Sequence, residues 1–145
     1  RGVEILEVTL HVGLGTFKSI EKEDIREHNM HSEYFSISSN TLSKLQSFKK
    51  SRRPIICLGT TSVRVLETLA QNNFENNSGW TNLFIYPPYN FSMVQGLFTN
   101  FHLPKSTLLI MVSAFYGRKK LLEAYCAAVE EKYRFFSYGD CMLIL

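Results

Sequence analysis

Five segments of this 145-residue chain concentrate glycine, histidine, hydroxyl and carboxylate residues beyond what packing requires. They cover residues 10–17, 27–33, 59–64, 96–107 and 135–140. Side chains of these types transfer protons, bind anions or hydrogen-bond a nucleoside. Because the segments are far apart in the sequence, they can form one site only if the elements between them bring their ends together.

The first segment, LHVGLGTF, places two glycines at the end of an expected strand. Glycine there lets the backbone approach a ligand closely, so Gly13, Gly15 and Thr16 are candidate binding residues. The spacing is not GxGxxG, and a dinucleotide site is therefore not indicated. A β-bulge or a turn is the alternative interpretation.

The second segment combines His28 and His31, three residues apart, with Glu33. Two imidazoles and a carboxylate can ligate a metal, but no further ligand follows at a reliable spacing, so no metal site is predicted. His31 and Glu33 are instead candidate catalytic residues, because such groups transfer protons at physiological pH. Hydrogen-bonded structural histidines are the alternative.

The third segment, GTTSVR, lies where an expected buried strand passes into a helix. The first turn of a helix presents unpaired N–H groups and the positive end of the helix dipole. Gly59, Thr60, Thr61 and Arg64 therefore form a candidate anion site, with a guanidinium that fits a carboxylate or a phosphate. Ordinary helix capping, with Arg64 paired to Glu67, is the alternative.

The fourth segment places Asn100, His102 and Lys105 among aromatic residues, a mixture that suits recognition of a base or nucleoside. His102 is a candidate for proton transfer, and Asn100, Lys105 and Ser106 are candidates for substrate binding. The run Lys-Ser-Thr ends like a P-loop, but the upstream GxxxxG is absent, which argues against nucleotide hydrolysis. A loop whose phenylalanines anchor it in the core is the alternative.

The fifth segment ends in Gly139 and Asp140, directly before an expected terminal strand. The pair is typical of a turn, but the carboxyl group of Asp140 could also act as an acid or hold a substrate hydroxyl. Basic clusters at 49–53 and 118–120 are interpreted as solvated helix ends rather than as phosphate tracks.

The elements between these segments alternate between strands and helices, which predicts an α/β fold with a layered sheet and flanking helices. Ser38 or Ser39 can cap one helix, and Ser106 can cap another. Strands are expected at 3–12, 33–37, 55–58, 83–86 and 141–145, helices at about 39–50, 60–70, 107–116 and 118–134, one helical turn at 21–26, and a polar loop at 72–79.

The composition is that of one globular domain or part of one, with 45% hydrophobic and 20% charged residues. The net charge of +3 permits a polyanionic partner without arguing for one. Three cysteines without a CxxC pattern are expected to be free thiols, which favours a cytoplasmic location. No apolar run reaches the ~20 residues of a membrane helix. The first residue is Arg1, so we expect the natural amino terminus to lie upstream.

Together the segments resemble the S-adenosylmethionine:tRNA ribosyltransferase-isomerase family of queuosine biosynthesis. The matching stretches occur in the family's order and are VTLHVGLGTF, EHNMHSEY, GTTSVRVLE, GWTNLFIYPPYNF, LFTNFHLPKSTLL and YRFFSYGDCMLIL. The resemblance implies that residues 1–145 are the carboxy-terminal part of a large α/β domain. It also implies an amino-terminal half with an inserted β-barrel domain, neither of which this chain contains.

The resemblance implies that the ribosyl part of S-adenosylmethionine is transferred and isomerised onto 7-aminomethyl-7-deazaguanine in tRNA. The product is epoxyqueuosine, with release of adenine and methionine, and S-adenosylmethionine is a substrate rather than a cofactor. No metal is required. The candidate roles become proton transfer for His31, Glu33, His102 and Asp140, donor binding for Gly13, Gly15, Thr16, Gly59, Thr60, Thr61 and Arg64, and substrate binding for Asn100, Lys105 and Ser106.

Other functions stay open. The chain could be an inactive fragment of the family, with sheet edges and apolar surface left uncovered, which invites association. It could also be a tRNA-binding module without donor binding. A methyltransferase that uses the same donor would need a glycine-rich loop after its first strand and an acidic residue ending the second, and neither pattern is clear.

Overall fold

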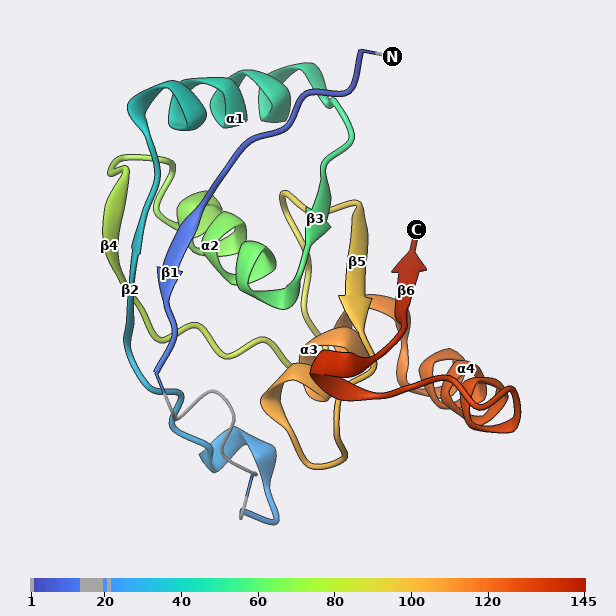
Figure 1. Cartoon of the computed structure of the whole chain (residues 1–145). Coiled ribbons are helices and arrows are strands. Elements are labelled where there is room, and N and C mark those ends of the chain that lie inside the picture. Colours follow the sequence, from blue (N-terminus) through green and yellow to red (C-terminus); the bar gives the residue numbers. More distant parts are fainter. Residues whose placement is uncertain (1, 14–19, 21) are drawn as a thin grey trace.

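The structure is a computed structural model that describes residues 2–13, 20 and 22–145 of the chain. Two small sheets lie on either side of the central helix α2 (Thr60–Gln71), as Figure 1 shows. The predicted α/β class is confirmed. The described strands are divided between two three-stranded sheets, and α2 fills the space between them.

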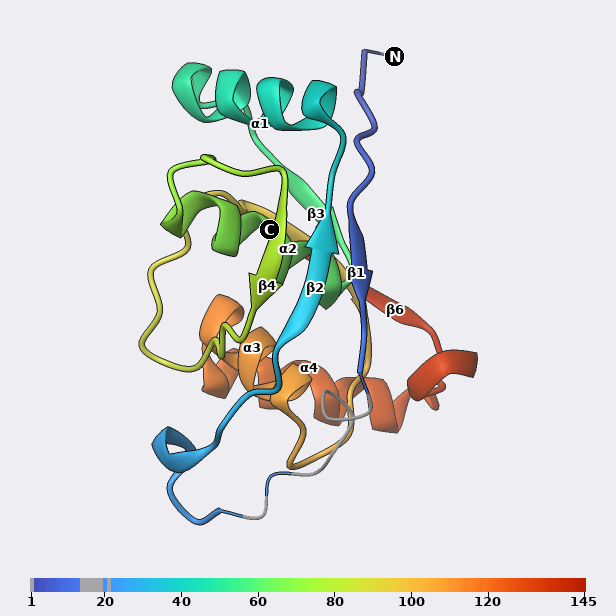
Figure 2. The same ribbon diagram turned by 90° about the vertical axis from the view of Figure 1, so that its left-hand side faces the viewer.

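The first sheet is antiparallel, with β2 (Glu33–Ser36) between β1 (Thr9–His11) and β4 (Ser78–Thr81). Figure 2 shows this sheet from its outer side, with α2 behind it. Successive residues of a strand point to opposite faces. Phe35 therefore packs into the core, while Trp80 on the outer face is 68% exposed.

The second sheet has the order β3 (Ile56–Leu58), β5 (Gly96–Asn100) and β6 (Cys141–Ile144). β3 and β5 are parallel, and α2 lies in the connection between them, which confirms the predicted strand–turn–helix unit. β6 runs antiparallel to β5. The outer face of this sheet is open and apolar, with exposed side chains at Ile56, Leu58, Phe98, Leu143 and Leu145.

The remaining helices are α1 (Ser39–Ser51), α3 (Thr107–Tyr116) and α4 (Arg118–Glu130). The side chain of Ser38 accepts from the N–H of Thr41 at 3.0 Å, and that of Ser106 accepts from Leu109 at 3.1 Å. Both predicted caps are therefore confirmed. Gly117 joins α3 to α4 with a φ of 89°, a backbone conformation that residues with a Cβ rarely adopt. No helix in the described part of the chain is long and apolar enough to cross a membrane.

Helix α2 is buried along most of its length because it has a sheet on both sides. Its Glu67 is fully buried and accepts hydrogen bonds from the N–H groups of Ser92 at 3.0 Å and Met93 at 2.9 Å. The carboxylate of Glu67 thus holds the loop that precedes β5 against α2. The suggested ion pair between Arg64 and Glu67 is wrong, because Arg64 binds Glu33 on the other side of α2.

Several predicted boundaries are wrong. Residues 83–86 form no strand, and β4 lies earlier, in residues that pair with β2. Residues 96–100, for which no strand was predicted, form the central strand β5, because β3 and β6 supply backbone partners on both sides. The strand expected at 3–12 is regular only at Thr9–His11, and α4 ends at Glu130 instead of 134.

Candidate functional site

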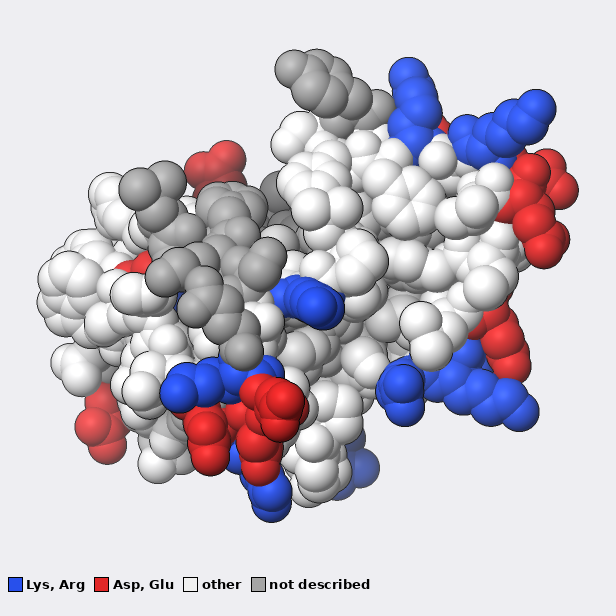
Figure 3. Space-filling view, turned by 90° about the horizontal axis from the view of Figure 1, so that it is seen from below, with Lys and Arg blue, Asp and Glu red and all other residues white. Residues whose placement is uncertain are grey.

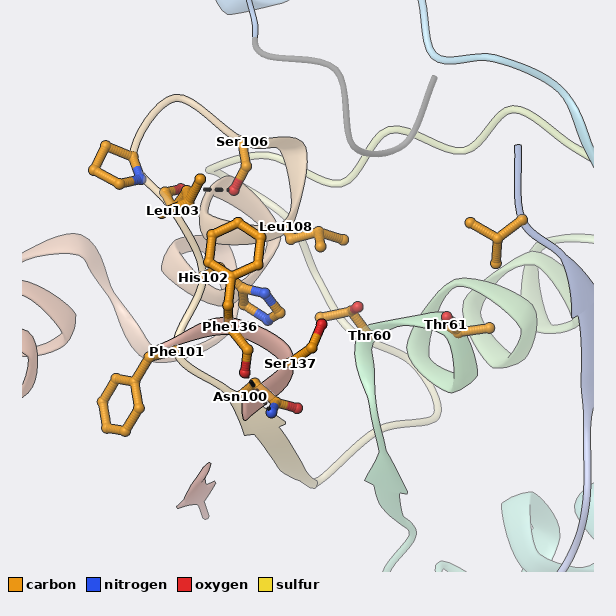
Figure 4. Close-up of a pocket in the computed structure, with 12 residues that line it drawn as sticks. Thr60, Thr61, Asn100, Phe101, His102, Leu103, Ser106, Leu108, Phe136 and Ser137 are labelled. Atoms are coloured by element: carbon orange, nitrogen blue, oxygen red, sulfur yellow. Dashed lines mark hydrogen bonds between the residues drawn. The ribbon is translucent and has the colours of Figure 1, made fainter. Parts of the chain in front are cut away.

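A pocket of about 360 Å³ lies where β5 ends and α2 begins. It is lined by Val12, by Thr60 and Thr61, by residues 100–104, by Ser106 and Leu108, and by residues 136–137 (Figure 4). Four of the five segments singled out from the sequence therefore meet in one place. The convergence follows from topology, since the carboxyl ends of the parallel strands β3 and β5 lie at the same edge of their sheet.

The first turn of α2 forms one wall of the pocket. Gly59 has a φ of 82° and donates its N–H to the carbonyl of Phe98 at 2.8 Å, which joins the start of α2 to β5. As the N-cap, Gly59 has no side chain to accept from the N–H groups of the first turn. These donors, the helix dipole and the adjacent hydroxyls of Thr60 and Thr61 form a favourable environment for an anion.

His102 faces this wall from the loop that follows β5 (Figure 4). Its Nε2 lies 2.9 Å from the hydroxyl of Thr99, and its backbone N–H donates to the hydroxyl of Tyr125 at 2.7 Å. Burial lowers the pKa of His102 from 6.5 to about 4, since desolvation penalises the imidazolium. At neutral pH the pocket therefore contains an uncharged imidazole.

Asn100, at the end of β5, contributes an amide to the same pocket. Its Nδ2 donates to the carbonyl of Phe136 at 3.1 Å, and the N–H of Phe136 donates to the carbonyl of Phe101 at 3.1 Å. The two bonds hold the aromatic ring of Phe136 over the pocket next to His102 (Figure 4). An amide and an aromatic ring are suited to recognising a planar base.

Asp140 lies outside the pocket wall but shapes the segment that carries Phe136. Its carboxylate accepts from the backbone N–H of Arg134 at 2.8 Å and from its guanidinium at 3.2 Å. These hydrogen bonds lower the pKa of Asp140. A Cβ on Gly139 would lie 2.4 Å from the carbonyl of Arg134, so only glycine fits this turn.

Glu33 and Arg64 form a buried ion pair close in the sequence to residues that line the pocket. Nη1 of Arg64 donates to Oε2 of Glu33 at 2.7 Å, and both side chains are at most 2% exposed. Oε1 of Glu33 accepts from the N–H of Gly13 at 2.8 Å. The pair ties the end of β1 to α2, one helical turn below Thr60, and so fixes the distance between two walls of the pocket.

The other predicted site residues lie in different positions. His31 is exposed and outside the described pocket lining, as is Lys105, whose backbone φ is 59°. Ser106 lines the pocket and also caps α3. Gly15 and Thr16 lie outside the described residues. In the part of the chain that the structure describes, no three His, Cys, Asp or Glu side chains gather closely enough to hold a metal ion.

Several pocket residues were not singled out by the sequence analysis. Phe136 and Ser137 lie in the fifth segment, in which Asp140 was the predicted site residue. Thr99 does not line the pocket, but its hydroxyl contacts Nε2 of His102, three residues later in the sequence. Val12 and Leu108 have no signal in the sequence, because their contact with the pocket follows from the packing of β1 and α3.

Electrostatics at the lower end of the molecule are mixed. Figure 3 shows acidic and basic side chains at several places around the margin of this face, one basic side chain near its middle, and uncharged side chains over much of the part that is not grey. A ligand here would therefore be held by hydrogen bonds and apolar contact more than by a broad charged surface.

Comparison with known proteins gives a consistent result. A family model described as "Queuosine biosynthesis protein" matches residues 1–144. Curated proteins from a Sulfurihydrogenibium species and from Acetivibrio thermocellus, both named S-adenosylmethionine:tRNA ribosyltransferase-isomerase, are each 55% identical to this chain. The matches cover 100% and 99% of the chain but 43% of each relative. The chain thus spans less than half the length of the curated relatives that it matches.

A solved structure also resembles the chain. The crystal structure of S-adenosylmethionine tRNA ribosyltransferase from Thermotoga maritima at 2.00 Å resolution superimposes with a TM-score of 0.71 and 48% sequence identity. The superposition covers 78% of this chain and 41% of that one.

Proposed function

This chain belongs to the queuosine biosynthesis family, and we propose that it forms part of an S-adenosylmethionine:tRNA ribosyltransferase-isomerase. In this proposal residues 1–145 are the carboxy-terminal part of a large α/β domain. The observation that carries the proposal is the meeting of four family-like segments at one pocket. The pocket offers an anion-binding helix start, an uncharged imidazole, an amide and an aromatic ring.

The proposed substrates are S-adenosylmethionine and a tRNA that carries 7-aminomethyl-7-deazaguanine; no cofactor is invoked. The first turn of α2, with Thr60 and Thr61, holds an anionic group, either the methionine carboxylate or a tRNA phosphate. Asn100 and Phe136 hold a base by hydrogen bonding and stacking. An uncharged His102 does not repel the sulfonium of the donor.

The proposed reaction begins with removal of a proton from the ribose carbon next to the sulfonium, whose positive charge acidifies that carbon. Adenine then leaves with help from an acid, and the aminomethyl nitrogen attacks the sugar. An oxygen atom finally closes the epoxide and expels methionine. We assign proton transfer to His102, because it is the imidazole that lines the pocket, and such a group contributes roughly 10²–10⁴-fold.

Glu33 and Asp140 fit positioning roles better than direct proton transfer. Glu33 is bonded to Arg64 and Gly13, and Asp140 is bonded to Arg134, so each fixes a wall of the pocket. Arg64 then acts as a positioning residue, because its ion pair with Glu33 holds the start of α2, which carries the proposed anion site. Direct participation of His31 and Lys105 would require the substrate to extend beyond the described pocket.

The proposal includes a cytoplasmic location, where tRNA and reduced thiols coexist. The three cysteines are free, with Cys57 buried and Cys126 and Cys141 exposed. Burial and the charge of Glu67 raise the pKa of Cys57 to about 12, so its thiol is protonated and unreactive.

Analysis of the released products tests this function. The chain is incubated with S-adenosylmethionine and modified tRNA, alone and together with the polypeptide that corresponds to the rest of its relatives. Release of free adenine is the expected result. Release of S-adenosylhomocysteine would instead establish a methyltransferase. His102→Gln should reduce turnover at saturating substrate roughly 10²-fold or more. His31→Asn, at an exposed imidazole outside the described pocket lining, should leave turnover close to that of the wild type; an equal loss there would show that the substrate extends beyond the pocket to His31.

A second candidate function is binding without turnover. It is favoured by the coverage of 43% of each relative and by the open apolar face of the second sheet. Under this function the chain binds tRNA but releases no adenine, and its affinity falls with salt. Titration with S-adenosylmethionine distinguishes the two, because donor binding by the chain alone requires a complete pocket.

A further inference from the structure

The outer face of the first sheet carries a row of aromatic side chains that takes no part in the pocket. His11 on β1, Tyr34 on β2 and Trp80 on β4 are direct register partners. The ring centroids of His11 and Tyr34 are 5.9 Å apart, and those of Tyr34 and Trp80 are 5.6 Å apart. Trp80 is 68% exposed, so most of its indole is open to a ligand.

A row of hydroxyl groups runs beside these rings. Thr9, Ser36 and Ser78 are register partners two residues along each strand and therefore share the outer face. Thr9 and Ser36 also line a groove of about 510 Å³ between β1 and the start of α1. Aromatic surface and hydrogen-bonding groups thus form one continuous strip, which we call the aromatic strip.

We propose that the aromatic strip, defined by these six residues, binds unpaired nucleobases of the tRNA next to the modified one. The inference rests on the proposed function and adds the surface that receives the RNA. Bases of any sequence stack on aromatic rings, and hydroxyls hydrogen-bond base edges and the ribose 2′-OH. The strip begins at His11, and the next residue, Val12, lines the pocket. An RNA strand on the strip therefore leads toward the reacting base.

The aromatic strip differs in chemistry from the outer face of the second sheet. That face is mainly aliphatic, whereas the strip offers aromatic rings for stacking and hydroxyl groups for hydrogen bonds. The groove is bordered by one carboxylate, Glu7, and one ammonium, Lys44, and Lys44 is paired with Glu4. Binding here therefore depends on stacking, and it should contribute little to the salt dependence of RNA affinity.

Trp80 provides a direct test because it is the one tryptophan in the chain. The probe is an RNA hairpin whose loop leaves several bases unpaired, and stacking of a base on the indole should quench its fluorescence. Affinity for a labelled hairpin, measured by anisotropy, should fall about 5- to 150-fold in Trp80→Ala and recover in Trp80→Phe. The slope of log affinity against log salt should stay unchanged. Tyr116→Ala, at a partly exposed ring on α3, is the matched control.

Two results would overturn the inference: equal hairpin affinity in the wild type and Trp80→Ala, or an equal loss in Tyr116→Ala. Titration with S-adenosylmethionine separates this failure from failure of the proposed function. Intact donor binding and adenine release without a Trp80 effect refute the aromatic strip alone. A Trp80-dependent hairpin affinity without any donor binding supports the strip and counts against the proposed reaction.

Discussion

Stability of the chain should depend on pH through the buried imidazole of His102. In the folded chain the pKa of His102 is lowered from 6.5 to about 4 by burial. Between these two values the unfolded chain binds a proton that the folded chain does not, so acid favours unfolding. The free energy of unfolding should therefore fall as the pH drops from 6.5 to 4. Below pH 4 both the folded and the unfolded chain bind this proton, and His102 causes no further loss.

The size of the effect follows from the same pair of values. Each unit of pKa difference corresponds to 1.36 kcal/mol, so the imidazole accounts for at most about 3 kcal/mol across the interval. That is a large part of the 5–15 kcal/mol typical of a whole domain. His102→Gln keeps an uncharged group near the hydroxyl of Thr99 and removes the titration.

Urea unfolding of both proteins at a series of pH values measures the effect. The wild type should lose about 3 kcal/mol more than His102→Gln between pH 6.5 and 4, while the two curves run parallel above pH 7. His31→Asn, at an exposed ring, should follow the wild type. Parallel curves for the wild type and His102→Gln over the whole range would show that the pKa of His102 is not lowered in the folded chain.

Three further predictions concern residues around the pocket and on the open sheet. Arg64→Met should lower the free energy of unfolding in urea by about 3–5 kcal/mol, because it leaves the buried carboxylate of Glu33 without this partner. The double variant with Glu33→Gln should recover part of that loss. Additive losses in the two single variants would contradict the coupling between these residues. Gly139→Ala should weaken S-adenosylmethionine binding in calorimetry more than it lowers stability, since the new Cβ displaces the segment carrying Phe136. Leu143→Lys should reduce concentration-dependent association in light scattering, because Leu143 is 51% exposed on the apolar sheet; unchanged association would place the contact elsewhere.

Local signals predicted the elements whose formation depends on nearby residues. Helices α1 and α3 begin after the capping serines that the sequence indicates, since a cap needs only the first turn of its own helix. The terminal strand and the turn from β3 into α2 were also predicted correctly. Central strand β5 was missed, because its glycine and polar residues are typical of a loop until β3 and β6 supply hydrogen-bond partners.

The candidate site shows the same division between local and distant information. Sequence patterns identified the segments containing Thr60, Asn100 and His102, because glycine, hydroxyl and imidazole residues are concentrated there. They did not reveal that Arg64 pairs with Glu33, 31 residues away, instead of Glu67 on the same helix. Arg64 binds Glu33 because its side of α2 faces the first sheet, to which Glu33 belongs.

Residue types and their order along the chain were enough to establish the family, the alternating α/β pattern and the groups capable of chemistry. The meeting of those groups in one pocket, the burial that keeps His102 uncharged and the aromatic strip across three strands required the folded arrangement. The physical reason is that propensity and capping act within a few residues, whereas desolvation and strand register depend on neighbours that folding alone brings together.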